Sequence, residues 1–132
     1  MCLIIDKKQC PKGYKIAKKN IPCYKMLLVT RYNNLETPTM RCRVSPTESL
    51  VADTFQTEAY CDFPGYVAFV EKGIHSYTTL KKAKQIKEHW MCSLSFFYKK
   101  VIIKRAYIPK GTKYWVGKGH EFCSERIVFV KK

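Results

Sequence analysis

The feature that most limits what this 132-residue chain can fold into is the shortness of its apolar runs. These runs, such as residues 23–30, lie between proline, glycine and asparagine residues, a pattern typical of strands joined by turns. Only residues 80–92 carry apolar side chains near helical spacing, and Thr78-Thr79 before them offers an N-cap. We therefore predict an α+β domain that is dominated by strands and has one main helix at about residues 79–92.

The chain is expected to form a single domain, 1–132, because its length is typical of one domain and no linker or repeat divides it. The longest apolar stretch, Met26–Val29, is far too short to span a membrane. Charged residues also interrupt the first apolar run, so we expect no signal peptide and a cytoplasmic location. The predicted strands are residues 23–30, 40–44, 66–70, 73–77, 101–108, 113–116 and 126–130.

The formal charge of +15 comes from 25 basic residues against 10 acidic ones. Such a surface attracts anions, which points to nucleic acid, nucleotides, phosphorylated metabolites or an acidic protein as partner. Most of the bases are lysine, which is also the usual solubilising residue, so solubility is an equally open explanation. The chain has no signature of an RRM, KH or helix-turn-helix module.

The seven cysteines form no C-x-x-C pair, and an odd number favours reduced thiols. Two His-x-x-Cys pairs, His89/Cys92 and His120/Cys123, could together supply the four ligands of a tetrahedral zinc site. Neither pair has zinc-finger spacing, and cysteines more often act as small buried apolar residues. The expectation is therefore that no metal is bound, with these four residues as the only zinc candidates.

A constellation spread along the chain gives the most information on function. It comprises Cys23-Tyr24-Lys25, the segment Gly73 to Thr79 before the helix, the turn Pro109 to Thr112 after a strand, and Ser124-Glu125-Arg126. In order and spacing this set resembles the ADP-ribosyltransferases. In that family a Tyr-Arg strand, a Ser-Thr strand before a helix, an Ile-Pro-x-Gly turn and a Glu-x-Glu strand follow one another.

The resemblance implies a split β-sandwich that holds NAD. Lys25 stands where the family has the arginine that binds phosphate or ribose, and Ser76 matches the serine of the Ser-Thr strand. Glu125 matches the second glutamate, whereas Tyr77 replaces a threonine and Cys123 the first glutamate. Since these replacements affect catalysis more than binding, the resemblance implies nucleotide binding without turnover and no bound cofactor.

The predicted ligand-binding residues follow from this comparison. They are Lys25, Arg105 and Lys110 on the phosphates, His75 and Ser76 on the ribose, and Tyr77, Tyr114 or Trp115 stacking on the base. For Tyr77 and Trp115, packing in the core is an equally open alternative. If the protein is instead an active NAD-dependent transferase, Glu125, His75 and Tyr77 are its candidate catalytic residues.

The whole chain also resembles a group of small proteins from gut bacteria and their phages. The shared features are the Met1-Cys2-Leu3 start, the CYK strand, a G-[FYI]-H-S-[FY] motif and the turn from Ile108 to Trp115. This resemblance implies an origin on a mobile element but no activity. The leading hypothesis is a non-catalytic binder of a phosphorylated nucleotide, ADP-ribose- or NAD-derived or cyclic.

In a phage, such a binder would act as a counter-defence sponge for a host immune signal, in the cytoplasm of the host. Sites of this kind often lie between protomers, so a homo-oligomer is compatible with it. The alternative hypotheses are a sequence-tolerant nucleic-acid-binding protein, or inhibitor of a nucleic-acid-guided defence complex, and the active ADP-ribosyltransferase.

Overall fold

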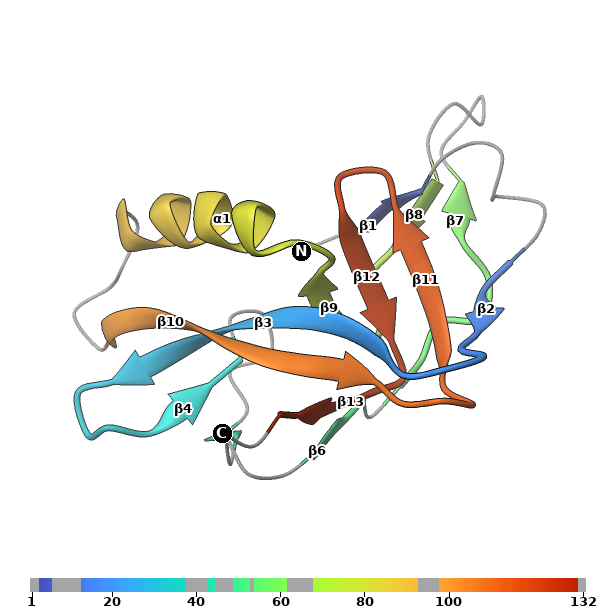
Figure 1. The fold of residues 1–132 in the computed structure, drawn as a ribbon. Coiled ribbons are helices and arrows are strands. Elements are labelled where there is room, and N and C mark those ends of the chain that lie inside the picture. The colour runs from blue at the N-terminus through green and yellow to red at the C-terminus, as the bar shows by residue number, and fades with distance from the viewer. Residues whose placement is uncertain are drawn as a thin grey trace.

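The computed structural model describes residues 3–5, 13–37, 43–44, 49–52, 54–61, 68–92 and 98–130. Within these residues it contains thirteen strands and one helix, so the prediction of an α+β fold made mostly of strands is confirmed (Figure 1). Most of the strands are short. The predicted strand 40–44 is described only at Arg43–Val44, and the predicted strand 66–70 only at Ala68–Val70.

The elements follow one another along the chain in this order: β1 (Leu3–Ile5), β2 (Lys15–Ile16), β3 (Ile21–Thr30), β4 (Leu35–Glu36), β5 (Arg43–Val44), β6 (Ser49–Val51), β7 (Tyr60–Cys61), β8 (Ala68–Val70), β9 (Ile74–Tyr77), α1 (Leu80–Cys92), β10 (Tyr98–Ile108), β11 (Lys113–Gly117), β12 (Glu121–Ser124) and β13 (Arg126–Phe129).

The strands form two antiparallel sheets. The larger sheet has the order β2-β11-β12-β9-β3-β10-β13-β6, with β4 pairing β3 and β5 pairing β4, and the smaller has the order β1-β8-β7. At its centre β3 pairs with β10 along its whole length, from Ile21↔Ile108 to Thr30↔Tyr98. In Figure 1 these two long strands cross the molecule together, with α1 on one side and β13 and β6 on the other.

The larger sheet consists of two halves that meet at one place. β3 pairs with β9 only through Tyr24↔Tyr77, although β9 continues to pair with β12 over four residues. One half is therefore β2-β11-β12-β9, and the other is β3-β10-β13-β6 with β4 and β5. Pro22 lies two residues before Tyr24 and has no backbone N–H to donate. Among the described residues, no strand pairs with β3 at Pro22 on the side of β9, so the missing donor costs no hydrogen bond there.

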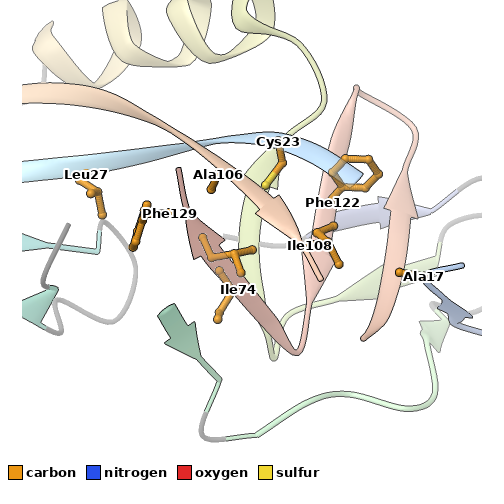
Figure 2. Close-up of a cluster of buried hydrophobic side chains, with 9 residues drawn as sticks. Ala17, Cys23, Leu27, Ile74, Ala106, Ile108, Phe122 and Phe129 are labelled. Atoms are coloured by element: carbon orange, nitrogen blue, oxygen red, sulfur yellow. The ribbon is translucent and has the colours of Figure 1, made fainter. Parts of the chain in front are cut away.

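Buried side chains form three clusters around this sheet. Figure 2 shows the first, in which Cys23 and Leu27 of β3 and Ala106 and Ile108 of β10 join side chains from β9, β12 and β13. A second cluster, around Trp115, lies between β11, β12 and the small sheet. The third lies beneath α1, and its buried members are Met26, Leu28, Tyr77, Ala83 and Val101.

The helix begins and ends close to the predicted limits. Thr79 caps it, because its Oγ1 accepts a hydrogen bond from the Lys82 amide at 3.2 Å and its carbonyl accepts one from the Ala83 amide at 3.2 Å. Ala83, Ile86 and Trp90 pack against the sheet, whereas Lys81 and Lys84 are exposed. The predicted amphipathic helix over about 79–92 is thus confirmed as Leu80–Cys92.

Gln56 connects its own irregular segment to the end of β8 and to the residues that follow β8. Its side-chain NH2 donates to the Glu58 and Phe69 carbonyls at 2.7 and 3.1 Å, and its Oε1 accepts from the Glu71 amide at 2.9 Å. Its own carbonyl accepts from the Trp115 indole at 2.7 Å. One side chain therefore holds residues 69–72 in place before β9 begins.

Gly73 is required by its conformation and by its surroundings. Its φ of 146° is unfavourable for other residues, and an added Cβ would lie 2.5 Å from Cys123 Sγ and 3.2 Å from the Ser124 carbonyl oxygen. We expect Gly73→Ala to lower the free energy of unfolding by about 2–4 kcal/mol. The measurement is urea denaturation followed by tryptophan fluorescence.

Gly119→Ala is the matched control, since an added Cβ there meets nothing nearer than the end of the Lys82 side chain at 3.6 Å. Equal stabilities of the two variants would contradict the close packing of Gly73 against β12.

Candidate functional site

The candidate site is a groove on the sheet face that carries α1, beyond the end of the helix. Its floor and walls come from β3, β10 and the residue after β13, and it encloses about 220 Å³. Tyr24 shares its face of β3 with Met26, which packs under α1, so the groove continues the helix-covered face where the helix no longer covers it. The lining residues are Asn20, Pro22, Cys23, Tyr24, Arg105, Ala106, Tyr107 and Val130.

Strand pairing fixes the positions of the polar and aromatic groups in the groove. Arg105 lies opposite Tyr24, and Tyr107 lies opposite Pro22 in the β3–β10 register. The Val130 amide donates to the Arg105 carbonyl at 3.0 Å, which continues the sheet past the end of β13. The guanidinium therefore projects from the middle of three paired strands, with an aromatic ring on the neighbouring strand and another two residues along its own.

The Arg105 side chain is exposed, and within the described residues its guanidinium makes no hydrogen bond or ion pair. Tyr24 and Tyr107 beside it are half-buried, so each ring keeps one part packed and another part accessible. At the rim, Asn20 Oδ1 accepts a hydrogen bond from the Lys110 amide at 3.0 Å, which fixes the Asn20 side chain and leaves its NH2 group as a donor. The groove thus combines a cation, a neutral donor and two aromatic walls.

A buried polar cluster lies at the junction between the two halves of the sheet. Lys25 is only 4% exposed, and its Nζ donates to the His75 carbonyl at 2.7 Å. The His75 Nε2 lies 2.7 Å from the Glu71 carbonyl, so this nitrogen carries the proton, and it lies 4.0 Å from Cys123 Sγ. Within the described residues, His75 Nδ1 and the hydroxyls of Ser76 and Ser124 are buried without hydrogen-bond partners.

Burial governs the protonation of this cluster. It lowers the pKa of Lys25 to about 8 and also lowers the pKa of His75, because both charged forms lose solvation. It raises the pKa of the Cys23 thiol to about 11 and that of Cys123 to about 12, and the nearby Lys25 charge partly offsets both shifts. At neutral pH the imidazole and both thiols are therefore uncharged, and neither thiol is an activated nucleophile.

The structure does not bring the eight predicted ligand-binding residues into one pocket. Arg105 lines the groove and exposed Lys110 lies at its rim through Asn20. The remaining six lie in the interior or against it. Lys25, His75, Ser76 and Tyr77 are buried around the junction, Trp115 is 1% exposed within the second cluster, and half-buried Tyr114 stacks edge-on against Phe122. Tyr77 and Trp115 pack in the core, which was the alternative considered for these two residues.

The three candidate catalytic residues are not arranged as a set. Tyr77 lies opposite Glu121 in the β9–β12 register, whereas Glu125 lies beyond the other end of β12, after Ser124↔Ile74. Burial raises the pKa of Tyr77, and the Glu121 charge adds to this effect. Burial also raises the pKa of Glu121, which Lys82 partly offsets. The carboxylate near Tyr77 is therefore Glu121, which the sequence analysis did not select.

The three zinc candidates whose side chains are described, His89, His120 and Cys123, do not converge. His89 is exposed on α1, His120 is exposed in the turn before β12, and Cys123 is buried next to Trp115 and His75. The Cys92 side chain lies outside the described part of the structure. His120 and Cys123 cannot bind one metal ion together, because the His120 side chain faces solvent and the Cys123 side chain faces the interior. Across the described ranges, no three His, Cys, Asp or Glu side chains gather as a metal site would require.

Tyr24 and Tyr107, the aromatic walls of the groove, were not predicted from the sequence. Once Arg105 had been selected on the strand 101–108, alternation along the strand would have pointed to Tyr107 on the same face. Tyr24 carried no comparable signal, because its position opposite Arg105 depends on the long-range register between β3 and β10.

Comparisons with protein-family models, with curated proteins and with solved structures gave no match. Among the residues that the structure describes, no helix has the length and apolar character needed to cross a membrane.

The buried Lys25 makes a prediction about stability and pH. Its pKa falls from 10.5 to about 8 on folding, so between these values the unfolded chain binds more protons and stability rises with pH. The two buried thiols act oppositely, because the unfolded thiols ionise near pH 9 while the folded ones stay protonated. The Lys25 contribution must therefore be measured as the difference between the wild type and Lys25→Met.

We expect the free energy of unfolding of the wild type to gain about 1 kcal/mol relative to Lys25→Met between pH 8 and pH 9. Urea denaturation in the presence of a reductant at both pH values measures it. Lys104→Met is the control, since half-buried Lys104 lies opposite Lys25 on β10. If the free energies of unfolding of the wild type and Lys25→Met differed by the same amount at pH 8 and pH 9, the Lys25 ammonium would have to be solvated in the folded protein.

Proposed function

We propose that this protein binds a phosphorylated nucleotide in the groove between Tyr24, Arg105 and Tyr107 and does not transform it. The observation that carries the proposal is the exposed Arg105 guanidinium, which lies between two half-buried tyrosines and makes no ion pair within the described residues. A guanidinium binds phosphate oxygens through two parallel hydrogen bonds, and tyrosine rings stack on bases. These are the two chemical parts of a nucleotide.

The charge and size of the site support the same ligand class. The net charge of +15 draws anions toward the protein and raises the rate of their association. A hollow of about 220 Å³ is smaller than the ~300–1,000 Å³ typical of sites that enclose a whole drug-sized ligand. It would therefore hold one base or ribose-phosphate part of the ligand, with the rest lying along the exposed face.

The proposal includes the ADP-ribosyltransferase-like layout, and with it a ligand of the ADP-ribose, NAD or cyclic-nucleotide kind. It is supported by the division of the larger sheet into two halves that meet at Tyr24↔Tyr77, as a split sandwich requires. Binding is favoured over transfer because His75 and Tyr77 are buried and Glu125 lies apart from them. If the chain is encoded by a phage, such a binder would serve as a counter-defence sponge.

The test is to identify what the protein retains. The purified chain is incubated with NAD, ADP-ribose, cyclic ADP-ribose isomers and cyclic dinucleotides, desalted, denatured and analysed by mass spectrometry. We expect one unaltered compound to be released, and isothermal titration then gives its affinity. Arg105→Ala should weaken that affinity about tenfold or more, because a charge-assisted hydrogen-bonded pair is lost.

Arg126→Ala is the matched control, since Arg126 is also exposed and on a strand but does not line the groove. If both variants lost affinity equally, the ligand would be held by the overall positive charge of the protein, and its assignment to the groove would be wrong. Loss of NAD with release of nicotinamide would make the protein an enzyme, and Glu125→Gln would then test the transferase alternative.

A further inference from the structure

The turn between β3 and β4 presents an exposed tyrosine on a rigid support. Tyr32 is 86% exposed, the largest exposed fraction among the large apolar and aromatic side chains of the described residues. The Asn33 amide donates to the Thr30 carbonyl at 3.0 Å, the Thr30 amide to the Asn34 carbonyl at 2.9 Å, and the Asn34 amide to Thr30 Oγ1 at 3.1 Å. Asn33 adopts a φ of 64°, which asparagine tolerates. The ring is therefore held in solvent by an ordered turn.

Basic residues lie in this turn and on the strand next to it. Arg31 precedes it, and Lys99 and Lys100 come from the start of β10, where the register shifts between Tyr98 and Lys100. The Lys99 Nζ donates to Asn33 Oδ1 at 3.2 Å, which brings an ammonium to the turn. We call Arg31–Asn34 together with Lys99 and Lys100 the Tyr32 tip.

The nearby carboxylate forms no ion pair with Lys99 or Lys100. Glu36 on β4 is half-buried and accepts a hydrogen bond from the Tyr98 hydroxyl at 3.1 Å. Neither Lys99 nor Lys100 forms an ion pair with any residue that the structure describes. In Figure 1 the turn between β3 and β4 lies at the end of the molecule opposite the small sheet.

We propose that the Tyr32 tip binds single-stranded nucleic acid. An exposed tyrosine ring can stack on a nucleic-acid base whose face is accessible. The bases of a single strand are accessible in this way, whereas those of a duplex are already stacked on one another. Flanking ammonium groups bind phosphates and release counterions. A protruding tip suits a flexible strand, which can bend around it. This binding is separate from the proposed nucleotide groove, because no residue of the tip lines that groove.

The test uses the full chain and a 5′-fluorescein-labelled 15-mer of deoxythymidine or uridine, followed by fluorescence anisotropy over a series of salt concentrations. We expect Tyr32→Ala to weaken binding about fivefold or more through lost stacking, and Tyr32→Phe to bind like the wild type. The double variant Lys99→Ala/Lys100→Ala should lower the slope of log K against log salt by about 1.4, at ~0.7 for each phosphate on a single strand. Arg105→Ala should bind the oligonucleotide normally.

Lys118→Ala/Arg126→Ala is the matched control, since it removes two exposed positive charges away from the tip. An equal loss of affinity in the two double variants would mean diffuse attraction and would overturn the proposal. So would wild-type affinity in Tyr32→Ala, or the absence of an anisotropy change with the wild type. Tyr32 is almost fully exposed, so its removal should leave the melting temperature unchanged, which circular dichroism verifies.

Discussion

The larger sheet depends on the place where β3 meets β9, because a single residue pair and one buried ammonium connect its two halves there. β3 is paired with β10 on its other side and runs away from β9 after Tyr24↔Tyr77. Lys25 then supplies a hydrogen bond to the His75 carbonyl from within the interior. Since this bond has a charged donor and little competing water, it is stronger than its equivalent at the surface. The same segment of β3 carries Tyr24 on its opposite face, so the groove is positioned by this junction.

The parts of the fold that could be predicted are those whose cause is local. Thr79, the spacing of Ala83, Ile86 and Trp90, and the polar opposite face are all visible in the sequence, and the helix follows them. Strands β4 and β6 could not be predicted from the sequence. Each has only two or three residues, and such a short segment is a strand only because it pairs with a neighbouring strand, here β3 for β4 and β13 for β6. The first long strand was predicted to begin after Pro22. Because no described strand pairs with β3 at Pro22 on the side of β9, the proline is tolerated and β3 begins at Ile21.

The site was less predictable than the fold, because its residues are selected by burial and register. Lys25 lies within an apolar run, and its charge was predicted to contact a ligand. Its ammonium instead donates a hydrogen bond to the His75 carbonyl inside the protein. Arg105, which was predicted to bind phosphate, lines the groove, and its contact with phosphate stays a prediction. Its neighbours Tyr24 and Val130 come from strands far away in the chain, and no spacing rule links them to it.

The pairing of β3 with β10 also has a consequence for the order in which the molecule can assemble. About half of the chain lies between these two strands, so closing the loop that joins them carries a large entropic cost before any contact is gained. A ribosome will have released the apolar segment 21–30 well before its partner emerges, and until then that segment is exposed to aggregation. The groove arises only when the late strand docks, and Lys99 reaches the Tyr32 turn in the same step.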